Sequence, residues 1–146
     1  MSRRFNLAEA QSLIPSVDAL LREAISLKSE YQDAEEAMQA IAQRVGLMGG
    51  SMVNREHAID ARNRRDEARA KLRAAIEQVQ EYGCVLKDLD TGLIDFPTLL
   101  RGEEVYLCWK LGEPAIAFWH GVNEGFRGRK AIDQDFLDHH RGDRAH

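Results

Sequence analysis

The residues best suited to chemistry lie in the last third of the chain. Asp95 and His120 are a carboxylate and an imidazole, groups that hold divalent metals or move protons near neutral pH. Arg101 precedes one expected strand, and Glu124 and Arg129 follow another. An arginine there could grip a carboxylate or phosphate with two parallel hydrogen bonds. These five residues are the candidate ligand site, and His120 and Asp95 are the candidate ligands of a divalent metal, the one cofactor that the residues suggest.

The expected register of the last hairpin decides whether a cysteine can join this site. A turn centred on residues 112–113 places Val105 opposite His120 and Cys108 opposite Ala117. Successive side chains of a strand alternate between the two faces of a sheet. In this register Cys108 and His120 point to opposite faces, so we do not expect a zinc site that uses both.

Pairing of the preceding strand brings in the carboxylate. If Asp95 opposes Val105, then Asp95, Val105 and His120 form a row across three strands on one face. The pair could bind a metal or an anion, or act as acid and base. The alternative is structural: His120 bonds to a backbone carbonyl, and Asp95 caps a turn before Pro97. A structure with Asp95 and His120 on opposite faces would end the site hypothesis.

The elements that carry these residues follow a long helical segment. Asn6 and Glu9 have the spacing of a capping box, and Pro15 predicts a break between a short helix over about 7–13 and a long one. Apolar residues spaced by three and four predict two packed helices that end near 46–51 and 82. The two stripes are Val17, Leu20, Ala24, Leu27, Tyr31, Ala34, Met38, Ile41 and Val45, and then Ala58, Ala61, Arg65, Ala68, Leu72, Ala75, Val79 and Tyr82. Arg65 is expected to pair with Glu35 or Glu36.

The pattern changes to that of strands after Gly83. We expect strands at about 84–88, 93–96, 104–110 and 115–120, loops at 97–102 and 121–130, and a short helix within 131–139. The predicted fold is therefore α+β: a long antiparallel, coiled-coil-like helical hairpin followed by a four-stranded antiparallel β-meander. We expect a single domain over 1–146, with a helical part (1–82), a meander and loop (83–130), and a short C-terminal helix and tail (131–146).

Composition narrows the class of protein. The chain has 146 residues, 44% of them hydrophobic, and a formal net charge of -4. That charge argues against a nucleic-acid binder, since phosphate contacts demand a basic surplus. Cys84 and Cys108 lie in apolar segments, which predicts reduced, buried thiols of a cytoplasmic protein. We find no run of apolar residues long enough for a signal peptide or membrane span.

Several segments resemble a known family. The similar stretches are Phe5–Pro15, Gly83–Leu89, Gly92–Pro97, Val105–Glu113, Phe118–His120 and Gly125–Arg129. Together they resemble the prokaryotic domain-of-unknown-function family numbered 2203. The resemblance implies a bacterial, intracellular protein of this length, and it supplies no catalytic residues.

Two functional hypotheses follow. The long heptad stripe exceeds what one thin hairpin can bury, which predicts a self-associating binding or structural module, most simply a homodimer. The alternative is a small metal-dependent or acid–base enzyme with its site at the Asp95/His120 edge of the sheet.

Overall fold

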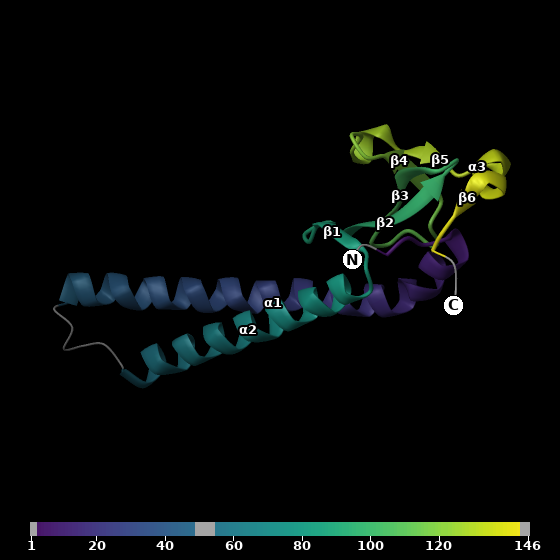
Figure 1. The fold of residues 1–146 in the computed structure, drawn as a ribbon. Helices are drawn as coiled ribbons and strands as arrows, with labels where there is room; N and C mark the ends of the chain where they lie inside the picture. Colours follow the sequence, from purple (N-terminus) through teal and green to yellow (C-terminus); the bar gives the residue numbers. More distant parts are fainter. Residues whose placement is uncertain (1–2, 49–54, 144–146) are drawn as a thin grey trace. The chain divides into compact units, whose positions relative to one another are not determined.

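A computed structural model describes residues 3–48 and 55–143 of the chain (Figure 1). It contains the predicted α+β arrangement: two long helices, α1 (Leu7–Met48) and α2 (Arg55–Glu81), and then an antiparallel sheet. The sheet strands are β1 (Val85–Asp88), β2 (Leu93–Leu100), β3 (Glu103–Lys110), β4 (Phe118–Gly121), β5 (Lys130–Ala131) and β6 (His140–Arg141). A 3-10 turn η1 (Phe126–Gly128) precedes β5, and α3 (Gln134–His139) precedes β6. Contacts divide the chain into two units, Met1–Leu21 with Ile76–His146, and Arg22–Ala75.

Helix α1 begins at the predicted capping box but does not break at Pro15. The Glu9 amide donates to Asn6 Oδ1 at 2.7 Å, and the Asn6 amide donates to Glu9 Oε1 at 3.0 Å. Pro15 lies inside one continuous helix, so the predicted short helix over 7–13 is wrong. A proline inside a helix lowers stability by about 3 kcal/mol, while burial of each aliphatic side chain raises it by about 1.5–3 kcal/mol. Ile14 and Val17, on either side of the proline, are both buried and hold the helix together.

Strand β2 is twice the predicted length. It continues through Pro97 to Leu100, and a two-residue turn, Arg101–Gly102, joins it to β3. The predicted loop at 97–102 is therefore wrong. The Pro97 carbonyl accepts a hydrogen bond from the Phe5 amide at 2.7 Å. The N and C=O of one residue point to the same side of an antiparallel strand. The nitrogen of Pro97, which has no hydrogen to donate, therefore faces Phe5, and no hydrogen bond between β2 and β3 is lost.

The observed register corrects both predicted pairings. Asp95 pairs with Cys108 rather than Val105, because the tight turn replaces the expected loop. His120 pairs with Tyr106 rather than Val105, a shift of one residue. The predicted strand 115–120 becomes β4, and the Ile116 amide before it donates to Gln11 Oε1 at 2.8 Å instead of joining a ladder with β3.

The two faces of the sheet have different surroundings. On one face, Ile94, Phe96, Leu107 and Trp109 join the core. Their partners there come from the N-terminal segment, from the helices and from the C-terminal region: Phe5, Ile14, Val17, Leu21, Val79 and Phe136. Strand alternation therefore places Asp95, Cys108 and His120 together on the other face.

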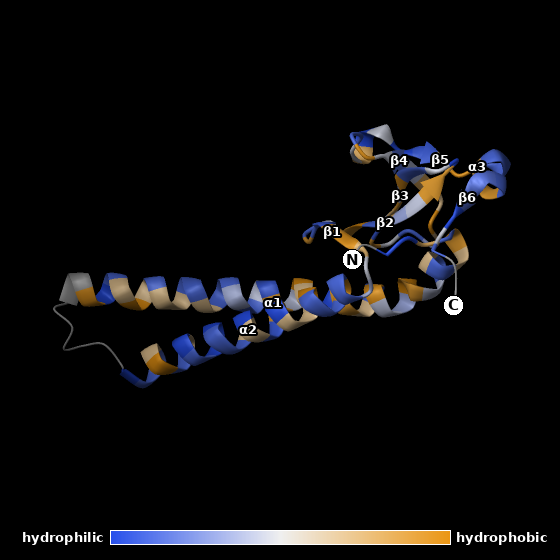
Figure 2. Ribbon diagram, viewed as in Figure 1, coloured by the Kyte–Doolittle hydropathy of each residue, from blue (hydrophilic) through white to orange (hydrophobic). Residues whose placement is uncertain are grey.

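The unit Arg22–Ala75 is a hairpin whose buried positions match the predicted stripes. These positions are mostly alanines, with one leucine: Ala24, Leu27, Ala34, Ala61, Ala68 and Ala75. Arg65 pairs with Glu35 at 3.4 Å, as predicted. Figure 2 shows that hydrophilic residues predominate along α2. The predicted turn around 46–51 partly falls outside the described residues, since α1 ends at Met48 and α2 begins at Arg55.

Candidate functional site

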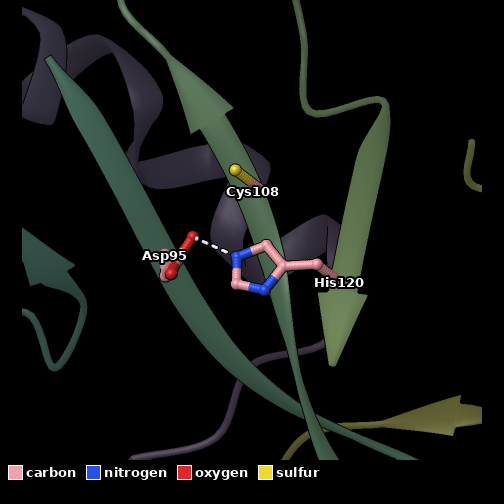
Figure 3. A group of neighbouring side chains, drawn as sticks. All are labelled: Asp95, Cys108 and His120. Carbon is pink, nitrogen blue, oxygen red and sulfur yellow. Dashed lines mark hydrogen bonds and ion pairs between the residues drawn. The ribbon is translucent and has the colours of Figure 1, made fainter. Parts of the chain in front are cut away.

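Asp95, Cys108 and His120 form one cluster on three neighbouring strands (Figure 3). Each offers a carboxylate oxygen, a sulfur or a ring nitrogen, and these atoms all lie within 4.8 Å of one another. The three residues are 1%, 1% and 3% exposed. The predicted exclusion of Cys108 from a site with His120 is therefore wrong, because the one-residue shift of β4 turns His120 to the face of Cys108.

The hydrogen bonds of His120 define which of its ring nitrogens is available. Nδ1 lies 2.9 Å from the Gly121 carbonyl oxygen, and Nε2 lies 3.0 Å from Asp95 Oδ1. A carbonyl oxygen can only accept, so Nδ1 carries a proton and donates it. The contact between Nε2 and Asp95 is a hydrogen bond, so one of these two atoms carries a proton. A metal ion could occupy the place of that proton.

Cys108 is not set up as a nucleophile. Burial is the main cause that raises the pKa of its thiol to about 12, and the nearby Asp95 carboxylate adds to it. A catalytic cysteine needs the opposite shift, since only the thiolate attacks. The raised pKa of Cys108 is therefore opposite to that of the nucleophile in a Cys–His–Asp hydrolase. A bound divalent ion reverses this preference, because its charge deprotonates a coordinating thiol.

The donor set fits a divalent transition metal. Sulfur, imidazole nitrogen and carboxylate oxygen are the three ligand types that zinc accepts, at about 2.0–2.3 Å. Metal-bound histidines almost always donate their other ring N–H to a carbonyl, a carboxylate or a water. The Nδ1 contact of His120 with Gly121 is such a support, and it holds the ring with Nε2 toward the other two donors.

Side chains from the same sheet face surround the cluster. The Tyr106 ring lies 5.5 Å from the His120 ring, and burial, Glu104 and Asp95 raise the pKa of its phenol. Phe118 pairs with Cys108 across the ladder. The Arg129 guanidinium lies 4.1 Å from the centroid of the Phe118 ring. These side chains cover the three donor groups on this face of the sheet.

Arg129 lies next to the cluster but is already engaged. Its Nη2 lies 2.7 and 2.9 Å from the two carboxylate oxygens of Glu113 and 3.4 Å from the Cys108 carbonyl oxygen. The Glu113 carboxylate also accepts the Lys110 amide at 2.7 Å. The positive charge of Arg129 is thus paired with the Glu113 carboxylate, while its buried Nε has no hydrogen-bond partner among the described residues.

Arg101 and Glu124 form contacts away from the three donors. Arg101 bonds Asp135 of the α3 helix with both terminal nitrogens, at 2.7 and 3.0 Å. Glu124 accepts the Gly121 amide at 2.8 Å and pairs with Lys130. Of the predicted site residues, the fold therefore brings Asp95 and His120 into contact, places Arg129 beside them, and gives Glu124 an indirect role through Gly121.

Sequence reasoning missed Cys108 and the supporting Gly121. Cys108 shares a face with Tyr106 and Lys110, as strand alternation predicts. Only the register between β3 and β4, which goes with the Gln11–Ile116 contact, relates that face to His120. A heptad or strand pattern carries no information on either feature.

No helix in the described part of the chain is long and apolar enough to span a membrane.

Comparisons place the chain in a family. Comparison with curated proteins and with solved structures gives no significant match. The family described as "Uncharacterized conserved protein (DUF2203)" matches residues 3–132, which is most of the chain and includes every residue of the cluster. The chain therefore belongs to the DUF2203 family.

Proposed function

We propose that this protein binds a divalent transition-metal ion through Asp95, Cys108 and His120. The observation that carries the proposal is the convergence of three different donor atoms within 4.8 Å on one sheet face. The hydrogen bond from His120 Nδ1 to Gly121 supports it, because it turns Nε2, the nitrogen that a metal would bind, toward the other donors. The structural alternative is that His120 and Asp95 only share a proton within the sheet.

Charge balance supports a divalent ion over other valences. A carboxylate and a thiolate carry two negative charges, and the imidazole is neutral. A divalent ion makes the group neutral, whereas a monovalent or trivalent ion leaves a net charge in a buried place, which is costly. The mixed donor set suits zinc or cobalt(II) better than magnesium or calcium, which prefer oxygen ligands.

The metal content of purified protein tests the proposal. Protein made without an affinity tag is dialysed with zinc and then against metal-free buffer, and its zinc is measured by elemental analysis. We expect one zinc ion per chain. Cys108→Ser should lose most of it, because a hydroxyl replaces the thiolate ligand.

Cys84→Ser is the matched control. Cys84 is also a buried, free cysteine, but its Sγ donates to the Val79 carbonyl at 3.2 Å and it is not part of the cluster. The control should keep its zinc. Equal zinc in both variants, or none in the unaltered protein, would refute metal binding at this cluster and leave the structural alternative.

A second candidate function, self-association, rests on the hairpin Arg22–Ala75. Most of its buried stripe positions are alanines, and three larger apolar residues of the stripe, Tyr31, Met38 and Ile41, are only half-buried. Ile59 is 51% exposed. A second copy of the hairpin would cover these side chains in a two-fold dimer, which makes the hairpin a structural module.

Light scattering at tens of micromolar tests the dimer. We expect a mass of two chains, and Ile59→Glu should shift the equilibrium toward one chain. Gln78→Glu introduces the same charge at an exposed position outside this hairpin and should leave the dimer intact. A single-chain mass for the unaltered protein would exclude self-association.

The cytoplasm is the location that this function favours. Cys84 and Cys108 are both free, and a thiolate ligand survives best where thiols are kept reduced.

A further inference from the structure

We infer that the bound ion keeps one coordination position for an exchangeable, neutral donor molecule, such as water or an imidazole-like base. This inference rests on the proposed metal site and adds the class of ligand that the site would take. Structural zinc sites almost always have four protein ligands, whereas sites that bind a further molecule have three. The number of protein donors therefore bears directly on what the site does.

The chain supplies three donors. In the part of the chain that the structure describes, no fourth His, Cys, Asp or Glu joins Asp95, Cys108 and His120. Of the side chains around them, Phe118 has no donor atom, the Arg129 guanidinium has no lone pair to give, and Tyr106 faces the cluster with its ring, 5.5 Å from that of His120. A tetrahedral ion held by the three donors would complete its coordination with a molecule from outside the chain.

The arrangement of the strands decides on which side of the sheet the fourth coordination position of the ion would lie. The three donors stand on neighbouring strands and on one face. The opposite face of these strands is filled by core residues such as Phe96, Leu107 and Trp109. The fourth position therefore points away from the core, toward side chains such as Tyr106 and Phe118 rather than toward a helix of the core.

Charge selects a neutral ligand over an anion. The carboxylate and the thiolate already neutralise a divalent ion, so an anion would leave a net negative charge in a buried site. Arg129 could offset that charge, but Glu113 holds its Nη2 at 2.7 and 2.9 Å and cancels it. The same balance weakens the ion as an activator of water, because two anionic ligands reduce its pull on a bound oxygen. A binding role is therefore favoured over hydrolysis.

Cobalt(II) is the probe, because its visible absorption responds to the number and type of its ligands. The full chain is loaded with cobalt(II) and titrated separately with imidazole and with azide. We expect imidazole to change the spectrum at a concentration at least about tenfold lower than azide, which corresponds to about 1.4 kcal/mol. A spectrum that neither molecule changes would show a closed site and overturn the inference, as would a preference for azide.

Glu113→Gln tests the charge argument within the same experiment. Glutamine keeps an acceptor for the Lys110 amide but removes the charge that cancels Arg129. The preference for imidazole over azide should shrink severalfold in this variant, and an unchanged preference would contradict the role of charge. If the protein takes up no cobalt at all, the proposed function itself fails, and that result is distinct from a cobalt-loaded protein that ignores both molecules.

Discussion

At the scale of single residues, two buried cysteines have different surroundings. Burial is the main cause that raises the pKa of Cys84 to about 11 and that of Cys108 to about 12. Among the residues that the structure describes, a carboxylate and an imidazole lie beside Cys108 but form no such group with Cys84. The chemistry of the site therefore depends on neighbours that come from other strands, since the two thiols themselves are alike in burial.

Native-state thiol labelling should be slow at both cysteines. A reagent must reach the sulfur and find it as a thiolate, and both residues are buried with raised pKa values. Mass spectrometry at pH 8, with and without denaturant, should show labelling of both only in the unfolded chain. Labelling of either cysteine at the rate of a free peptide thiol would contradict the burial of that strand.

Asp135 should make a pH-dependent contribution to stability through Arg101. The hydrogen bond from Arg101 is the main cause that holds the pKa of Asp135 below 3.8, its ordinary value. The contribution is therefore present above that value and is lost as the pH falls through the lower folded pKa. The free energies of unfolding of the protein and of Asp135→Asn should differ at neutral pH and converge in acid. A difference that stays constant with pH would exclude an ionic contribution.

The site residues show what a sequence can and cannot predict. Asp95 and His120 were expected on one face, and they are. The expected register was shifted by three residues between β2 and β3 and by one between β3 and β4. A shift by an odd number of residues moves a side chain to the opposite face relative to the neighbouring strand. Two such shifts lie between Asp95 and His120, so the two errors cancel and these residues still share a face. Only the one-residue shift between β3 and β4 lies between Cys108 and His120. The predicted register therefore placed Cys108 on the wrong face relative to His120 and excluded it from the site.

At the scale of elements, contacts distant in sequence decide where strands and helices end. The heptad stripes predicted both long helices, since that pattern is local. The continuation of α1 through Pro15, and of β2 through Pro97, depends on the core around Ile14 and on the Phe5 amide. Proline is a reliable local signal, and here tertiary contacts outweigh it twice.

The start of α1 should depend on His140. The Leu7 amide, in the first turn, donates to His140 Nε2 at 3.0 Å, and the Phe136 ring stacks on the imidazole at 5.1 Å. His140→Phe keeps a ring but removes this acceptor and the Nδ1 contact with the Phe136 and Leu137 carbonyls, so we expect a loss of at least about 0.5–1.5 kcal/mol in the free energy of unfolding. Denaturant titration measures it.

His139→Phe is the matched control for this prediction. His139 is exposed and contacts Asp135 at the surface, so its replacement should change stability by less than about 0.5 kcal/mol. Equal losses in the two variants would show that the bond to Leu7 contributes nothing specific.

At the scale of the whole molecule, the two units suit different roles. The unit that contains the sheet holds the donor cluster, and the hairpin Arg22–Ala75 presents long polar faces with half-buried apolar residues between them. Metal binding would join β2, β3 and β4 and stabilise that unit by mass action, by about 2.7 kcal/mol when the free ion is at 100 times its dissociation constant. Self-association would act through the other unit, so the two proposals can be tested separately.

X-ray absorption of the zinc-loaded protein tests the central claim most directly, because it reports the atoms bound to the ion. Coordination by Asp95, Cys108 and His120 with one outside molecule predicts one sulfur at about 2.3 Å and three nitrogen or oxygen neighbours at about 2.0–2.2 Å. The sulfur should disappear in Cys108→Ser and remain in Cys84→Ser. A zinc ion with no sulfur neighbour, or with two, would contradict the account.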